Sequence, residues 1–137
     1  MHANEEVARR EAEVLEAGDM DALAAMYADE FVLHYPGRSP VAGDYRGFPE
    51  FLARIRGLIG TDGTITRELH DALGSDDHAV QLLTVTANAR GRSHAWQGVV
   101  VMHTRDRRIT EAWVHIGDQY GLDEFLNSLA GASAPTH

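Results

Sequence analysis

Asp118 is the residue of this chain with the clearest potential for chemistry. It follows directly on the apolar segment WVHIG, which we expect to be the end of a buried strand. A carboxylate at such a place is costly unless it is hydrogen-bonded or solvated by a cavity. We therefore predict that Asp118 is a general acid or base. The alternative is that it caps the next turn and bonds only local backbone amides.

Histidines near two tryptophans supply further proton-transferring groups. His115 lies two residues after Trp113 and His94 two residues before Trp96, so each pair shares one side of its predicted strand. Imidazole changes charge near neutral pH, which suits a base. We predict that His115 is catalytic and that His94 binds the substrate. The alternative for each histidine is a core or interface residue with one hydrogen bond.

Tyrosines and other large side chains are predicted to complete the site. Tyr35 stands immediately before Pro36. A phenol with a pKa of ~10 is a poor base at neutral pH, so Tyr35 is expected to orient the substrate or stabilise an enolate. Aromatic side chains with polar tips suit planar ligands, although any core contains them too. The predicted substrate-binding wall is Leu33, Tyr45, His94, Trp96, Trp113 and Tyr120.

The composition excludes several mechanisms. The sequence contains no cysteine, so it has no disulfide, thiolate nucleophile or zinc–thiolate site. All 12 basic residues are arginine, which excludes a lysine Schiff base. The sequence also lacks a phosphate-cradling glycine motif and a recurring histidine–carboxylate spacing. We therefore expect chemistry without a cofactor or a metal ion.

Length and charge limit the organisation and the partners. A chain of 137 residues is expected to form one domain, residues 1–137, with residues 131–137 as a frayed tail. A net charge of −9 disfavours nucleic acid as a partner. The acidic N-terminus has no central apolar run and no apolar stretch approaches ~18 residues, so we expect a cytoplasmic protein without a membrane span.

The order of predicted elements indicates an α+β fold. Two helices are expected before a strand at 31–35, then a short extended piece at 44–46 and a third helix from Pro49. Strands at 64–73, 78–89, 93–104 and 109–118 follow, joined by short connections that favour antiparallel pairing. A short helix should end the fold. The residues expected to be buried are Leu23, Met26, Leu33, Phe51, Leu52, Ile55 and Val100.

The last two predicted strands carry bulky side chains on both of their sides. In the strand at 93–104, Trp96, Val100 and Met102 alternate with Val99 and Val101. A sheet with one face in water should instead alternate apolar with polar residues. One face would meet the helices, and a second subunit is the simplest cover for the other. We therefore predict a homodimer through the convex face of the sheet.

Three segments together resemble the SnoaL-like branch of the nuclear transport factor 2-like superfamily. They are residues 31–47 (FVLHYPGRSPVAGDYRG), 69–80 (LHDALGSDDHAV) and 109–125 (ITEAWVHIGDQYGLDEF). The resemblance implies a cone: a curved, mixed but mostly antiparallel sheet with three N-terminal helices on its concave face and an apolar pocket. It also implies an acid/base aspartate at the position of Asp118.

The chain lacks catalytic residues of two groups of enzymes in the superfamily that it resembles. Ketosteroid isomerases carry an aspartate base where Tyr35 stands, and the strand 93–104 has neither their oxyanion-hole aspartate nor the Arg-x-Asp of limonene epoxide hydrolases. We expect a cofactor-free acid/base enzyme that cyclises, isomerises or dehydrates a cyclic organic substrate. The alternatives are a non-catalytic module that binds a small apolar or aromatic ligand, and an interaction protein whose dimer is its function.

Overall fold

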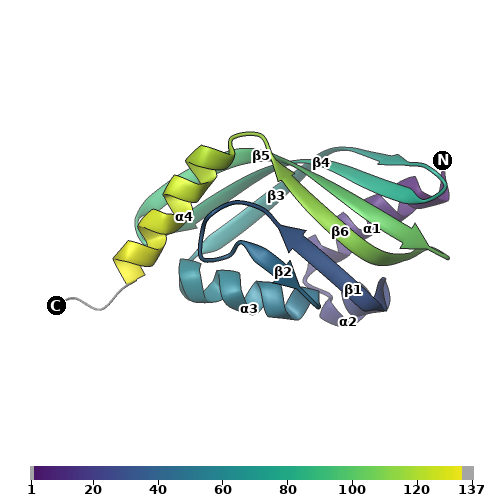
Figure 1. Ribbon diagram of the computed structural model, residues 1–137, viewed down its shortest axis with the longest axis horizontal. Coiled ribbons are helices and arrows are strands. Elements are labelled where there is room, and N and C mark those ends of the chain that lie inside the picture. The colour runs from purple at the N-terminus through teal and green to yellow at the C-terminus, as the bar shows by residue number, and fades with distance from the viewer. Residues whose placement is uncertain (1, 134–137) are drawn as a thin grey trace.

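One curved sheet of six strands organises the molecule (Figure 1). The computed structural model describes residues 2–133. Within that range the elements are, in chain order, α1 (Ala3–Ala17), α2 (Met20–Ala25), β1 (Tyr27–Tyr35), β2 (Gly43–Tyr45), α3 (Phe48–Ile59), β3 (Thr64–Gly74), β4 (His78–Ala89), β5 (Arg92–Arg105), β6 (Arg108–Ile116) and α4 (Gln119–Ser133).

The strand order in the sheet is β2-β1-β6-β5-β4-β3. The β1–β6 pair is parallel, and each other pair of neighbours is antiparallel. Short connections hold β3, β4, β5 and β6 as a meander, because consecutive strands joined by tight turns must run in opposite directions. The sheet is therefore mixed and mostly antiparallel, as predicted.

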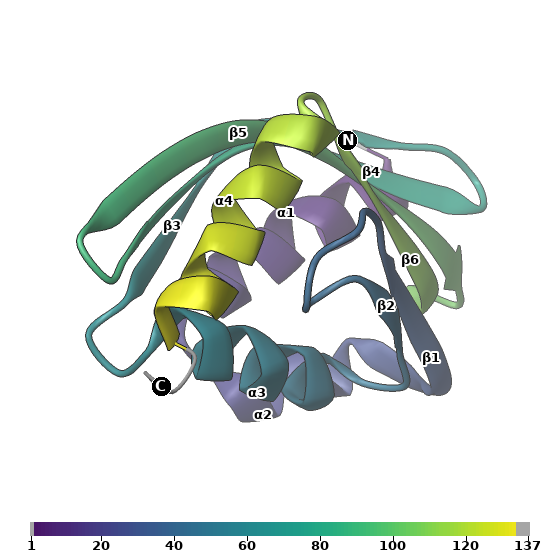
Figure 2. The same ribbon diagram turned by 60° about the vertical axis from the view of Figure 1, so that its left-hand side comes forward.

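Three N-terminal helices lie under the arch of the sheet, on its concave face (Figure 2). Gly18, at a φ of 72°, ends α1 in the left-handed conformation, and the Asp19 side chain then caps α2 by accepting a bond from the Ala22 amide. Helix α3 turns Ile55, Leu58 and Ile59 inward. The predicted fold class is confirmed.

The C-terminal helix is longer than predicted. Helix α4 crosses one end of the arch and buries Leu122, Phe125, Leu126 and Leu129 in the core (Figure 2). Residues 131–133 form the last turn of this helix, and residues 134–137 of the expected tail lie outside the described residues. In the part of the chain that the structure describes, no helix has both the length and the apolar character needed to cross a membrane.

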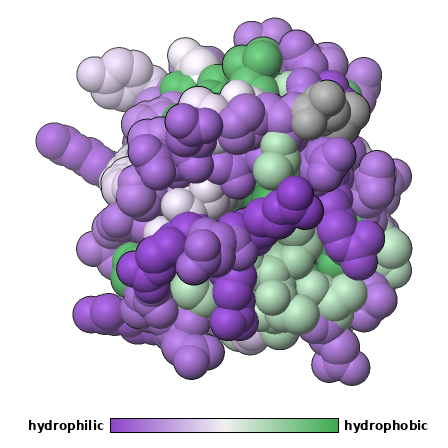
Figure 3. Space-filling view, turned by 90° about the vertical axis from the view of Figure 1, so that its right-hand side faces the viewer, coloured by the Kyte–Doolittle hydropathy of each residue, from purple (hydrophilic) through white to green (hydrophobic). Residues whose placement is uncertain are grey.

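Burial follows the alternation of the strands. Of the residues expected to be buried, Leu23, Leu33, Ile55 and Val100 are buried, whereas Met26, Phe51 and Leu52 are half-buried. Phe51 and Leu52 keep some exposed surface because they line a cavity. The end of the molecule that carries the N-terminus is mostly hydrophilic, with a green patch at the top of the view and a broader, pale green area at its lower right (Figure 3).

Candidate active site

A cavity of about 850 Å³ lies between the concave face of the sheet and helices α1, α2 and α3. Most of its wall is apolar and comes from alternate residues of the strands, because only every second side chain of a strand points to the concave face. On β5 and β6 these are Trp96, Gly98, Val100, Met102, Ala112, Val114 and Ile116. The volume suits a small organic molecule.

Five residues that line the cavity are also exposed on the surface, at the end of α1, the start of α2, helix α3 and the edge strand β3. They are Glu16, Met20, Ala53, Arg56 and Thr66. The Arg56 guanidinium is held in place there, because its Nη1 donates to the carbonyls of Gly60 at 3.2 Å and Gly63 at 3.0 Å.

Inside the cavity wall lies one cluster of hydrogen-bonded polar side chains around Glu11. Tyr27 donates its hydroxyl to Glu11 Oε2 at 3.2 Å. Gln81 donates its Nε2 to Glu11 Oε1 at 3.2 Å and to the Ala8 carbonyl at 2.9 Å. Arg67 places its Nη1 3.7 Å from Glu11 Oε1 and its Nη2 3.4 Å from Gln81 Oε1. We call these four side chains the Glu11 cluster.

The Glu11 cluster supplies the hydrogen bonds and the opposite charge that the Glu11 carboxylate needs in apolar surroundings. The Glu11 side chain is only 7% exposed, and a buried carboxylate is costly unless hydrogen bonds and an opposite charge compensate it. Tyr27 and Gln81 supply neutral donors from β1 and β4. Arg67 supplies the charge from β3. Its two contacts are long, and most of its five N–H donors have no partner among the described residues, so they can bind a ligand atom.

Two phenols of the cavity are held in the protonated form. Burial raises the pKa of Tyr27 well above its usual value, and the charge and hydrogen bond of Glu11 raise it further. Burial, more than any other cause, also raises the pKa of Tyr35, to about 12. The Tyr35 hydroxyl makes no hydrogen bond with another described residue. Both phenols are therefore donors at neutral pH, and Tyr35 can donate to a ligand.

Three of the residues predicted from sequence line this cavity: Leu33, Tyr35 and Trp96. Two others are close to it but do not line it. Tyr45 is buried, donates its hydroxyl to the Val41 carbonyl at 2.7 Å and packs edge-on against Phe51. His94 lies against α4, stacked on Phe125 at 5.2 Å and on Trp96 at 5.9 Å. Its buried Nε2 has no partner among the described residues.

The remaining predicted residues lie outside the cavity. Strand β6 turns Ala112, Val114 and Ile116 into the cavity, so Trp113 and His115 point to the convex face. Tyr120 is 90% exposed. The expectation that Trp113 and His115 share a cavity with Tyr35 and Trp96 is therefore wrong.

Asp118 lies on the surface, beyond the end of β6 at Ile116. Its Oδ1 accepts a bond from the Gly121 amide at 3.0 Å, in the first turn of α4. The expectation that Asp118 lies in the cavity is wrong, because the strand ends before it and the chain turns into the helix. The local capping interaction is the one that forms.

None of the four residues of the Glu11 cluster was predicted, although the sequence contains a signal for three of them. Arg67 alternates with Ile65 and Leu69 on β3, and Gln81 lies between Ala79 and Leu83 in the same alternation on β4. Glu11 shares the inward face of α1 with Val7, Ala8 and Val14. Polar residues at apolar positions of a periodic pattern mark buried polar groups that need partners.

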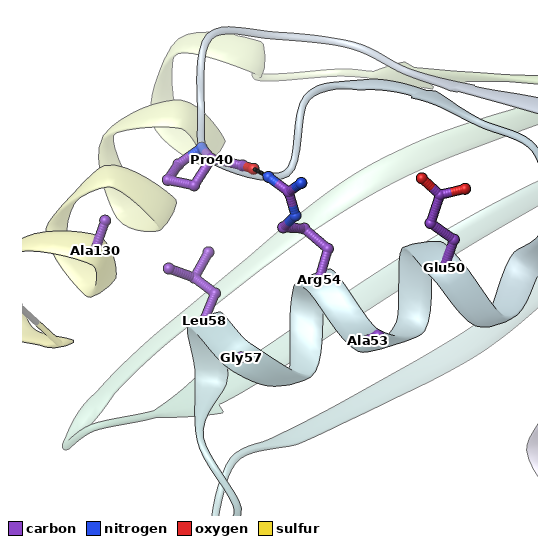
Figure 4. A pocket seen from close by; sticks show the side chains of 7 residues that line it. All are labelled: Pro40, Glu50, Ala53, Arg54, Gly57, Leu58 and Ala130. Carbon is purple, nitrogen blue, oxygen red and sulfur yellow. Dashed lines mark hydrogen bonds between the residues drawn. The ribbon is translucent and has the colours of Figure 1, made fainter.

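A second hollow lies on the surface between α3, α4 and the segment before β2 (Figure 4). It is an open groove of about 490 Å³, where Arg54 donates its Nη1 to the Pro40 carbonyl at 3.2 Å. Glu50 lies farther along the same helix (Figure 4). The groove has no buried acid, base or nucleophile among its lining residues, so the larger cavity is the candidate active site.

Comparisons with known proteins agree with this fold. The pattern of the SnoaL-like domain family matches residues 8–112. The solved structure of Bal32a, from a soil-derived mobile gene cassette, is 29% identical over 90% of this chain and 96% of its own, with a TM-score of 0.80. A comparison with curated proteins found no significant match.

More distant structures share the fold alone. TerC, co-crystallised with polyporic acid, is 17% identical over 91% of this chain and 98% of its own, with a TM-score of 0.78. An LEH-like epoxide hydrolase from M. tuberculosis is 13% identical over 96% and 97% of the two chains, with a TM-score of 0.67.

Proposed function

This chain belongs to the SnoaL-like domain family, and we propose that it is an enzyme that moves protons on a cyclic organic substrate without a cofactor. The observation that carries the proposal is the Glu11 cluster: a buried carboxylate, with its arginine, in a mostly apolar cavity. Cyclisation, isomerisation and dehydration all need such a group to take a proton from carbon or return it.

In this proposal Glu11 is the base and later the acid. Gln81 and Tyr27 hold its carboxylate in position, and a substrate C–H bond beside a carbonyl group gives its proton to a carboxylate oxygen. The free donors of Arg67 stabilise the oxygen that becomes negative, and the Tyr35 hydroxyl donates to a second substrate oxygen. Preorganised donors of this kind contribute roughly 3 kcal/mol each to transition-state stabilisation.

The proposed substrate is mostly apolar, with at least one oxygen acceptor. Leu33, Trp96 and Phe51 are proposed to contact its ring system, which agrees with the apolar wall of the cavity. That the similar structure of TerC was co-crystallised with polyporic acid supports an organic ligand of this size. The acid/base role expected of Asp118 passes to Glu11 in this proposal, because Asp118 is exposed.

The test is a panel of polyketide, terpenoid and steroid-like compounds, screened for both binding and turnover. Mass spectrometry of the purified protein for a bound ligand would direct the panel. Turnover that Glu11→Gln abolishes and Asp118→Asn preserves supports the proposal. Turnover that survives Glu11→Gln refutes it.

The alternative is a non-catalytic module that binds its ligand in the same cavity. The absence of the isomerase and hydrolase carboxylates from residues 93–104 favours it. Tight binding by a compound that is never turned over would establish this alternative.

We also propose that the protein is a homodimer through the convex face of the sheet. Half-buried Val99, Val101 and Trp113 on that face support it. Static light scattering at micromolar concentration would test it, and a monomer there would refute it. The cytoplasmic location stays a prediction for cell fractionation.

A further inference from the structure

One row of side chains crosses all six strands on the convex face. The register pairs Leu73 with Val80, Val80 with Val101, Val101 with Trp113, Trp113 with His34 and His34 with Asp44. The row is therefore apolar from β3 to β6 and becomes charged at β1 and β2. Leu73, at its apolar end, is 48% exposed.

His34 lies between two carboxylates at the charged end of this row. Its Nδ1 is 2.7 Å from Asp44 Oδ1, its Nε2 is 2.5 Å from Glu111 Oε2, and its ring stacks on Trp113 at 5.5 Å. Both ring nitrogens must donate to make these two bonds, and only the protonated imidazole has two N–H groups. In agreement, the hydrogen bonds to Glu111 and then Asp44 raise the pKa of His34.

The proton on His34 decides the charge of this cluster. With it, one positive and two negative groups leave one negative charge; without it, both carboxylates are uncompensated. Within residues 2–133 no arginine forms an ion pair with Asp44 or Glu111. The other titratable groups that face the cluster are His103, opposite Glu111 on β5, and His115, two residues along β6 from Trp113.

The convex face is large enough to support a stable dimer. Strands β3, β4, β5 and β6 have 11, 12, 14 and 9 residues. At ~3.3 Å per residue and ~4.8 Å between strands, the face across β3 to β1 measures roughly 20 Å by 30 Å. This projected area approaches the ~800 Å² per partner of a typical specific interface. A second copy also matches the face chemically, since an apolar row meets its own image.

We propose that the His34 cluster makes the dimer across the convex face depend on pH, so that two copies associate when His34 is protonated and separate when it is neutral. The inference rests on the proposed dimer and is independent of the chemistry of the cavity. In a two-fold symmetric interface each cluster occurs twice. Loss of both protons brings each chain to the net charge of −9 that it has with neutral histidines, and leaves the carboxylates of both clusters uncompensated at the interface.

The experiment measures the dimer dissociation constant by sedimentation equilibrium at about pH 6 and about pH 9, the two sides of a raised histidine titration. For the natural chain we expect the dimer dissociation constant to be at least about tenfold larger at the higher pH. His34→Asn should dissociate easily at both pH values, because its two carboxylates are never compensated. The double variant Asp44→Asn, Glu111→Gln should stay dimeric at both.

Asp62→Asn is the matched control. It removes one carboxylate from the turn before β3 instead of from the cluster, and it should keep the pH dependence of the natural chain. An equal dissociation constant at both pH values overturns the inference, as does a His34→Asn variant with the natural pH dependence; either result leaves the dimer standing. A monomer under all conditions overturns the inference and the dimer together. Turnover in the cavity is a separate measurement, so neither result bears on the proposed enzyme.

Discussion

The two faces of the sheet are built from neighbouring residues of the same strands, yet they present different chemistry. On the concave face, Glu11 and Arg67 form an ion pair inside an apolar cavity. On the convex face, His34 joins two carboxylates in contact with water. The buried charges are compensated as a fixed pair, whereas the exposed cluster is compensated only while His34 holds a proton.

This difference assigns separate tasks to the two sides of each strand. Leu33 lines the cavity and His34, the next residue, lies on the outside; the same holds for Ala112 and Trp113. Because side chains alternate at every residue, the cavity and the outer face can change independently. The enclosed concave face favours acid–base chemistry on a bound ligand. The open convex face favours an association that depends on the pH of the solvent.

The largest expected effect comes from a carboxylate on the inner face. Met102 is 1% exposed on the concave side, and its neighbour Val101 is half-buried on the convex side. In a Val101→Asp background, which should prevent the proposed dimer, adding Met102→Asp should lower the free energy of unfolding by about 4 kcal/mol or more, since it buries an unpaired charge.

Chemical denaturation followed by circular dichroism measures both variants. Val101→Asp alone should remain folded and become monomeric. If the double variant Val101→Asp, Met102→Asp is no less stable than Val101→Asp alone, the two faces differ less than their burial indicates.

The second effect separates the buried carboxylate from the exposed one. With any substrate that the chain turns over, Glu11→Gln should lower kcat by about 10²-fold or more while ligand affinity stays within a few-fold, because only proton transfer is lost. Asp118→Asn should leave kcat unchanged. Steady-state kinetics and calorimetry on the same preparations distinguish loss of catalysis from loss of binding, and the opposite pattern would restore Asp118 as the acid/base.

Most of the fold could be predicted because its signals are local. Alternating apolar residues predicted four of the strands to within a residue or two, and the three- and four-residue spacing of Ile55, Leu58 and Ile59 predicted α3. The boundary after α2 was harder. The next strand was expected to begin at residue 31, but the helix ends at Ala25, and β1 already begins at Tyr27. This shift places the Tyr27 hydroxyl beside Glu11.

The candidate site could be predicted only in part, because it depends on which side of a strand meets the helices. Both sides of β6 carry bulky residues, so the pattern did not decide between Trp113 and Val114 as cavity lining. Glu11 and Gln81 are 70 positions apart. Only the folded chain brings such distant residues together, and neither belongs to a known local motif.

The third effect probes Tyr35, a phenol that lines the cavity and bonds to no other described residue. Tyr35→Phe removes a hydroxyl that has no partner among the described residues and whose pKa is raised to about 12. The free energy of unfolding should change by less than about 0.5 kcal/mol. Affinity for a ligand that carries an oxygen acceptor should fall roughly fivefold to tenfold, which is the usual worth of one neutral hydrogen bond. Tyr45→Phe is the matched control, because the Tyr45 hydroxyl already donates to the Val41 carbonyl. A larger loss of affinity in the control would refute the role of Tyr35.

The smallest effect concerns the exposed cluster and the stability of the single chain. The pKa of His34 is raised in the folded protein, chiefly by its bond to Glu111. The stabilisation is therefore fully present below the unfolded histidine value of ~6.5 and is lost as the pH rises through the raised folded value. In the monomeric Val101→Asp background, the free energy of unfolding should fall by at most about 1 kcal/mol over that rise, since exposed ion pairs contribute little. Adding His34→Asn should flatten the profile, and urea denaturation at closely spaced pH values measures both curves. A profile that keeps its fall after His34→Asn would assign the pH dependence to another group, whereas a flat profile would identify His34 as the group that makes the outer face respond to pH.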